Sequence, residues 1–160
     1  MIDDKTPMRD VWHVEKPATT FWHKAIAGRL LSMRGADGAH AFYRPALHGD
    51  NPGDYVLPDI GVITRLPPDR LTCSALPGSA FTLVAEIVDL GGDEGERADK
   101  MDWYAQRGIP EYWIADQAPD RSDDDALVIV HRLESFGGKS VYQCERSLLL
   151  SELEAEYRAG

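Results

Sequence analysis

Two acidic residues interrupt apolar stretches of the sequence that would otherwise be typical of buried strands. Asp59 lies in VLPDIGVI and Glu86 lies in TLVAEIV. Burying a lone carboxylate is costly, so the fold has to expose these positions at an edge or cleft, or compensate their charge. A pair of hard carboxylate oxygens suits Mg²⁺ or Mn²⁺. The alternative is that each acid pairs with an arginine or caps a turn, and the residue types leave both possibilities open.

Lys100 is a basic residue that could join the two acids. It lies in a predicted helix, three and four residues before Trp103 and Tyr104, so its side chain could lean toward a neighbouring sheet. An ammonium beside metal-bound carboxylates can orient a water molecule and stabilise the charge that grows on a phosphate during hydrolysis. The alternative is a solvated helix lysine paired with Glu96.

The segments that must position these side chains have sequence patterns that predict a mixed α/β (α+β) domain. Residues 39–47, 55–65 and 81–90 are short, rich in β-branched and aromatic residues, and bounded by turn formers, which is typical of strands. Residues 91–108 begin with acids and end on glycine, which predicts a helix. A strand at 111–116 follows, and this order suggests a right-handed crossover. The apolar stripe expected along the helix consists of Ala98, Met101, Tyr104 and Ala105.

Further predicted elements precede and follow this strand–helix–strand segment. Residues 20–34 predict an amphipathic helix that Gly35 ends, and residues 126–134 and 140–145 predict a hairpin around two glycines. Residues 151–158 predict a final short helix. We expect one domain over residues 1–160, with residues 1–19 as an irregular lead-in. The apolar positions expected along the first helix are Phe21, Ala25, Ile26, Leu30, Leu31 and Met33.

Composition and charge narrow the function classes. The chain has 160 residues, of which 43% are hydrophobic and 28% charged, as in one folded domain. A net charge of -10 argues against a surface coated with cations for nonspecific nucleic-acid binding. The charge is uneven, because residues 1–50 carry seven Lys or Arg against six acids, whereas residues 51–160 carry ten against twenty-one. Contact with a polyanion is therefore expected in the first third of the chain.

Several alternatives have little support in the residues. No apolar stretch approaches the ~20 residues of a membrane-spanning helix, and the acidic start is unlike a signal peptide, so a cytoplasmic location is expected. Cys73 and Cys144 are far apart and lack metal-site spacing, which predicts two reduced, buried thiols. Ser74 and Ser79 lack the GxSxG motif of serine hydrolases.

The order of several motifs resembles one known family. Pro58-Asp59, Glu86-Ile87-Val88, Lys100, Tyr104 and GIPEYWIAD at 108–116 together resemble the Uma-type family of bacterial restriction endonucleases, a branch of the PD-(D/E)XK nuclease superfamily. The resemblance extends from about residue 20 to the C-terminus. In the wider superfamily the lysine stands two places after the acid, where this chain has Val88. The resemblance implies that the lysine has moved to Lys100 on the neighbouring helix.

The resemblance also implies a fold and a function. The fold would be a restriction-endonuclease-like mixed β-sheet flanked by helices, with a C-terminal β-hairpin. The function would be Mg²⁺-dependent hydrolysis of DNA phosphodiester bonds, with Asp59 and Glu86 as metal ligands and Lys100 as the third catalytic residue. His23 and Glu15 are further candidates for contacts with the substrate.

Other functions remain open at this point. Mn²⁺ could replace Mg²⁺, and the expected partners are DNA and a second copy of the chain in a homodimer, with no membrane involved. One alternative is a nuclease-like fold without catalysis that serves as a binding or assembly module. Another is a hydrolase that uses the same site on RNA.

Overall fold

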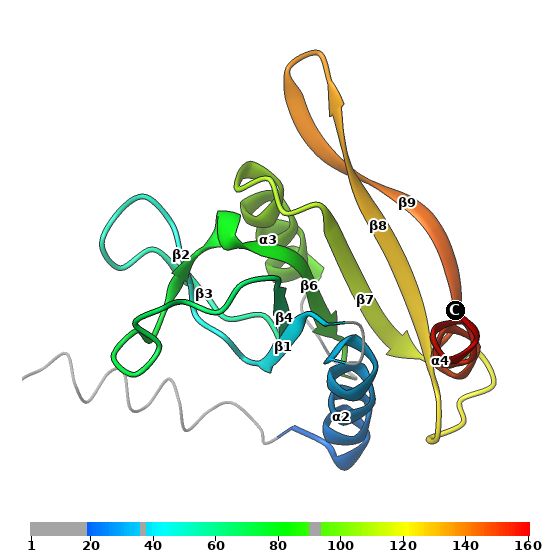
Figure 1. The fold of residues 1–160 in the computed structure, drawn as a ribbon. Coiled ribbons are helices and arrows are strands. Elements are labelled where there is room, and N and C mark those ends of the chain that lie inside the picture. The colour runs from blue at the N-terminus through cyan, green and yellow to red at the C-terminus, as the bar shows by residue number, and fades with distance from the viewer. Residues whose placement is uncertain (1–18, 36–37, 90–93) are drawn as a thin grey trace, which may run out of the picture.

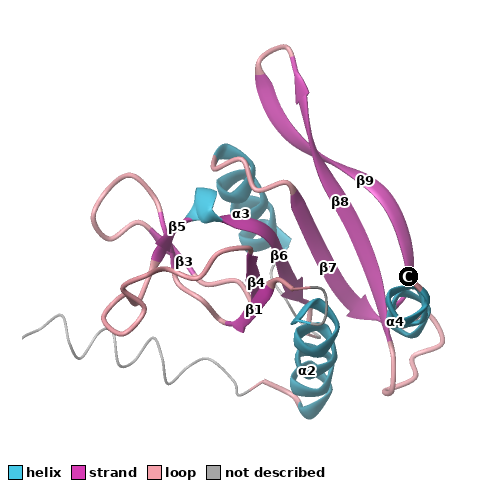
Figure 2. Ribbon diagram, viewed as in Figure 1, coloured by secondary structure: helices cyan, strands magenta, loops and turns pink. Residues whose placement is uncertain are grey.

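A six-stranded mixed sheet of order β1-β4-β6-β7-β8-β9 forms the centre of the computed structural model, which describes residues 19–35, 38–89 and 94–160 (Figure 1). Within this part of the chain, three α-helices pack on the sheet (Figure 2). The strands are β1 (His40–Tyr43), β4 (Ile60–Ile63), β6 (Phe81–Ile87), β7 (Glu111–Gln117), β8 (Ala126–Phe136) and β9 (Lys139–Leu149). The helices are α2 (Phe21–Gly35), α3 (Glu94–Gln106) and α4 (Leu150–Ala159).

A second, three-stranded sheet has the order β3-β2-β5. Its strands are β2 (Leu47–His48), β3 (Tyr55–Val56) and β5 (Leu76–Pro77), and β5 leads into the 3-10 turn η1 (Gly78–Ala80). The predicted strands 39–47 and 55–65 are therefore each split into two. Pro45 and Pro58 stand between the pieces, and a proline cannot donate the backbone hydrogen bond that a continuous strand needs.

The unit formed by β6, α3 and β7 positions most of the predicted site. The two strands pair in parallel, with Glu86 opposite Ile114, so the predicted strand–helix–strand order is confirmed. Gly108 follows α3 with a φ of 75°, a left-handed conformation that glycine adopts without strain. The chain can therefore turn directly from α3 into β7.

The two faces of the central sheet carry separate hydrophobic cores. Alternate residues of β6, Leu83, Ala85 and Ile87, pack with α2 and α4, whereas Val84 packs with Tyr104 of α3. Successive side chains of a strand point to opposite faces, so Glu86 shares the α3 face with Val84. Both faces of β4 and β6 are buried, because all residues of β4 and all of β6 except the half-buried Thr82 are buried.

The buried face of α2 differs from the predicted stripe. It consists of His23, Ile26, Ala27, Leu30 and Met33. Phe21 is 86% exposed and Ala25 is exposed, so their predicted burial was wrong. Each lies two residues from His23, about 200° around the helix, and therefore on the opposite face.

Two smaller expectations also fail. Ala98 of α3 is exposed, although Tyr104 and Ala105 are buried as predicted. Cys73 is half-buried and Cys144 is exposed, so neither thiol is buried as expected. Cys144 lies on β9, an outer strand of the sheet, in the hairpin that β8 and β9 extend beyond the other strands (Figure 1). None of the described helices is long and apolar enough to cross a membrane.

Candidate active site

Asp59 and Glu86 are neighbours on two paired strands. Ile60 lies opposite Ala85 in the antiparallel pairing of β4 and β6, so Asp59 and Glu86 are the next residues along the two chains. Each is 7% exposed. Oδ2 of Asp59 accepts a hydrogen bond from the backbone N–H of Ile87 at 2.8 Å. The fold therefore brings together two acids that are 27 residues apart in the sequence.

Helix α3 supplies two further side chains to Glu86. The Tyr104 hydroxyl donates a hydrogen bond to Oε2 of Glu86 at 2.5 Å, and Nζ of Lys100 lies 3.6 Å from the same oxygen. Lys100 also lies 3.7 Å from Oε1 of Glu96. The four-residue spacing places Lys100 and Tyr104 on one side of the helix. Lys100 thus contacts the buried acid as well as its helix neighbour, and its catalytic role stays a prediction.

The environment of Glu86 favours a cationic partner. Burial raises the pKa of Glu86 from 4.5 to about 6, and the neighbouring Asp59 charge adds to this rise, while Lys100 and Tyr104 oppose it. A desolvated carboxylate beside a second one gains from any cation that approaches both. The molecule thus holds an acidic pair whose charge the protein only partly compensates.

The donor set fits Mg²⁺. Mg²⁺ is usually bound through one or two carboxylates, together with water molecules and phosphate oxygens of the substrate. Asp59 and Glu86 offer such carboxylate oxygens. In the described ranges, no group of three or more His, Cys, Asp or Glu residues could hold a metal. The two carboxylates therefore suit an ion whose other ligands are water molecules and substrate oxygens.

His23 contacts the second carboxylate oxygen of Asp59. The residue is 3% exposed, with Nε2 3.2 Å from Oδ1 of Asp59 and Nδ1 2.9 Å from Oδ2 of Asp89. The bond to Asp59, followed by the weaker influence of Asp89, raises the pKa of His23 despite its burial. Both ring nitrogens face carboxylates, so a substrate phosphate could reach His23 only if the ring left one of them. The predicted phosphate contact is untested and stays a prediction.

Asp89 was not recognised as part of this group from the sequence. Its Oδ1 accepts a hydrogen bond from Oγ1 of Thr20 at 3.2 Å, and Oγ1 of Thr20 accepts one from the backbone N–H of His23 at 3.1 Å. Thr20 therefore caps α2 and ties its first turn to the end of β6. Asp89 lies two residues beyond the last residue of β6, whereas the sequence placed it inside the predicted strand 81–90, so no spacing pointed to it. Glu15, the other substrate candidate, lies outside the described residues.

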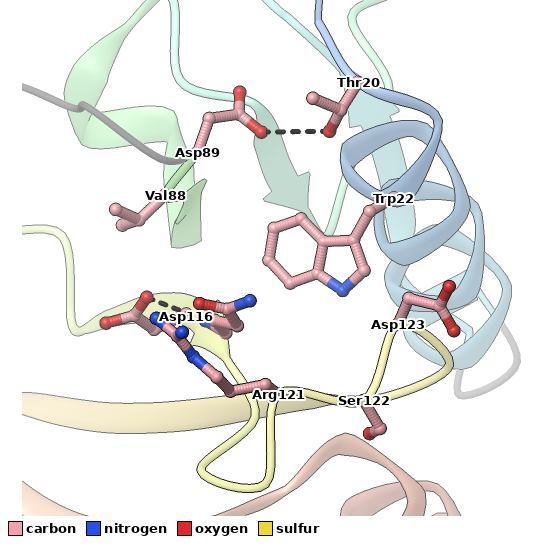
Figure 3. Close-up of a pocket in the computed structure, with 9 residues that line it drawn as sticks. Thr20, Trp22, Val88, Asp89, Asp116, Arg121, Ser122 and Asp123 are labelled. Carbon is pink, nitrogen blue, oxygen red and sulfur yellow. Dashed lines mark hydrogen bonds between the residues drawn. The ribbon is translucent and has the colours of Figure 1, made fainter.

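A pocket of about 180 Å³ opens beside Asp89 (Figure 3). Trp22 of α2 forms one wall, and Val88, Asp116 and Arg121 line other parts of it. The Trp22 indole N–H donates a hydrogen bond to the backbone oxygen of Asp125 at 3.0 Å, which fixes the ring. The pocket lies just beyond the carboxyl ends of β6 and β7. Such edges of α/β sheets commonly bind ligands, and this space has room for a small part of one.

Known proteins resemble this chain in sequence and in fold. The profile of the Uma2 family, described as "Putative restriction endonuclease", matches residues 12–155. The crystal structure of a protein from Anabaena variabilis ATCC 29413, described as a "putative nuclease belonging to DUF820", resembles this fold with a TM-score of 0.59. The two chains are 17% identical, and the match covers 89% of this chain and 85% of the other. The search of curated proteins found no significant match. At this identity, the structural likeness concerns the fold alone.

Proposed function

The chain belongs to the Uma2 family, described as "Putative restriction endonuclease", and on this premise we propose that it is a Mg²⁺-dependent endonuclease that hydrolyses phosphodiester bonds of DNA. One observation carries the proposal. Nζ of Lys100 lies 3.6 Å from the buried Glu86, which is next to the buried Asp59. Three separate segments of the chain thus bring a cation and two acids into one group.

Each residue has a defined part in the proposed reaction. Asp59 and Glu86 would hold the metal, and a bound Mg²⁺ supplies a water of lowered pKa and neutralises charge on the departing oxygen. Lys100 orients the attacking water and places positive charge beside the phosphate. Tyr104 fixes the carboxylate of Glu86 through its hydroxyl, and His23 fixes that of Asp59. This division of roles agrees with hydrolysis by in-line attack on phosphorus.

One observation favours a second candidate function. The net charge of -10 opposes close approach of a polyanion, as expected of a nuclease-like module that binds or assembles without catalysis. Such a module would not need the acidic pair to bind a divalent ion. Metal binding and strand cleavage therefore distinguish the two candidates. The endonuclease proposal also includes Mn²⁺ as a possible metal, a cytoplasmic location, and a homodimer that cuts both strands of a duplex.

The test is plasmid nicking in Mg²⁺ and in Mn²⁺, with metal binding followed by calorimetry. Asp59→Asn should lower the nicking rate at least ~100-fold, because it removes one of the two carboxylates that would hold the metal. Glu134→Gln, on an exposed position of β8, is the matched control and should leave nicking unchanged. Circular dichroism of both variants checks that the fold is retained.

The outcomes separate the candidates. Nicking that persists unchanged in Asp59→Asn would show that the activity comes from elsewhere. Absence of both nicking and a divalent-ion site in the wild type would support the binding module. Parallel assays on RNA decide which nucleic acid is cleaved.

A further inference from the structure

Arg44 has an unusual backbone conformation at the edge of the candidate site. It directly follows β1 with a φ of 51°, in the left-handed region that residues other than glycine rarely occupy. It also precedes Pro45, and a residue before proline normally prefers an extended conformation. In the described part of the chain, Arg121 is the one other non-glycine residue with a positive φ.

Contacts on both sides hold Arg44 in this conformation. Its backbone N–H donates a hydrogen bond to the carbonyl oxygen of Asp59 at 2.8 Å. The following Pro45 packs closely over Gly61, where an added Cβ would lie 2.7 Å from the proline ring. The sheet geometry itself therefore fixes the place of Arg44.

The strand pairing places Arg44 beside the acidic pair. Tyr43 lies opposite Ile60 in the antiparallel pairing of β1 and β4, so Arg44 and Asp59 are the next residues along these strands. Asp59 is in turn the neighbour of Glu86. A cation and two acids thus occupy successive places in one row across three strands.

The side chain of Arg44 is available for a ligand. It is exposed, and no carboxylate of the described residues lies within ion-pairing distance of its guanidinium, whereas Arg29 and Arg107 form close ion pairs at 2.7 and 3.0 Å. Glycine would adopt this φ without strain. Arg44 therefore combines a strained backbone beside the site with an exposed side chain that forms no ion pair among the described residues, a combination typical of functional residues.

A nuclease with this charge needs cations where the substrate lies. The acidic pair repels phosphate groups, and all of the excess negative charge lies in residues 51–160. Arginine presents a planar set of donors that matches phosphate oxygens. Resting on the proposed function, we propose that Arg44 is a substrate-binding residue that contacts a backbone phosphate of the nucleic acid beside the bond to be cleaved.

Arg44→Gly tests this inference, because it removes the guanidinium while relieving the backbone. Binding of a short fluorescein-labelled duplex would be measured by anisotropy over a range of NaCl concentrations, in Ca²⁺, a hard cation that takes the same type of oxygen ligands. The slope of log K against log salt should become shallower by about 0.9, the value for one lost phosphate contact. The melting temperature should stay equal or rise. In plasmid nicking, KM should increase more than kcat falls.

Two further variants sharpen the result. Arg44→Lys keeps the charge and should keep the wild-type salt dependence. Arg158→Ala removes the same charge from an exposed position near the end of α4 and should leave the slope unchanged. An equal effect in Arg158→Ala would show that only the net charge matters, which overturns the assignment of Arg44.

The remaining outcomes distinguish this inference from the proposed function. If the wild type nicks DNA and Arg44→Gly has an unchanged salt slope and KM, the role of Arg44 is overturned and the endonuclease proposal stands. If the wild type binds DNA but never nicks it, and the salt slope is reduced in Arg44→Gly, the endonuclease proposal is overturned and the phosphate contact of Arg44 stands. A wild type that does not bind DNA overturns both.

Discussion

Replacing Glu86 by glutamine should stabilise the fold while removing the proposed activity. Burial raises the pKa of Glu86 from 4.5 to about 6. The difference of about 1.5 corresponds to ~2 kcal/mol, because each pKa unit is equivalent to ~1.36 kcal/mol. At pH 7 the native protein therefore carries a carboxylate that is more stable in the unfolded chain. Glutamine removes this charge and keeps an oxygen that can accept the Tyr104 hydrogen bond.

The sign of the pH dependence follows from proton binding. The folded pKa lies above the unfolded value, so between about pH 4.5 and 6 the native state binds more protons than the unfolded state. The contribution of Glu86 to wild-type stability is therefore present below this window and is lost as the pH rises through it. Glu86→Gln should resemble the wild type near pH 4 and exceed it by up to ~2 kcal/mol near pH 7.5.

Urea unfolding followed by tryptophan fluorescence at the two pH values measures the difference. Glu134→Gln, the exposed control on β8, should change the free energy of unfolding by less than about 0.5 kcal/mol at both. If Glu86→Gln were less stable than the wild type near pH 7.5, Lys100 and Tyr104 would already compensate the charge. The acidic pair would then need no further cation.

Three further predictions concern the groups around the acids. Nicking at subsaturating Mg²⁺ should fall as the pH drops below about 6, because a proton on Glu86 competes with the metal; a pH–rate profile without an acid limb would contradict this. Tyr104→Phe removes a hydrogen bond that lowers the pKa of Glu86, so the acid limb should move to higher pH, and an unmoved limb would show that the hydroxyl is dispensable. His23→Gln should cost about 1.5–3 kcal/mol of stability at pH 6 in urea unfolding. Since the pKa of His23 is raised, this cost should shrink as the pH rises above 6.5, and a cost independent of pH would speak against an imidazolium held by Asp59 and Asp89.

Much of the architecture could be predicted because local signals and tertiary packing agree. The segments around Glu86 and the hairpin at Gly137-Gly138 have strong apolar or turn patterns, and the structure has strands there. The features that differ from the prediction depend on contacts between segments distant in the sequence. Phe21 and Ala25 fit a helical periodicity, but only the position of the sheet decides which side of α2 is buried.

The candidate site was predictable to a similar extent. Asp59 and Glu86 stand out because they break apolar strands, and Lys100 has a spacing that places it on the same helix side as Tyr104. Asp89 and Arg44 carry no such signal. Asp89 matters because α2 presents His23 to it, and Arg44 because the β1–β4 pairing sets it beside Asp59. These relations arise from contacts between distant segments and cannot be obtained from spacing.

The central claim is that Asp59 and Glu86 bind one divalent ion together. Anomalous diffraction from crystals grown with Mn²⁺ tests it most directly, because the ion is located without any assumption about activity. We expect a peak at about 2.0–2.2 Å from an oxygen of each carboxylate, within reach of a substrate phosphate. Mn²⁺ bound elsewhere, with the Asp59–Glu86 pair lacking a peak in a saturated crystal, would contradict it.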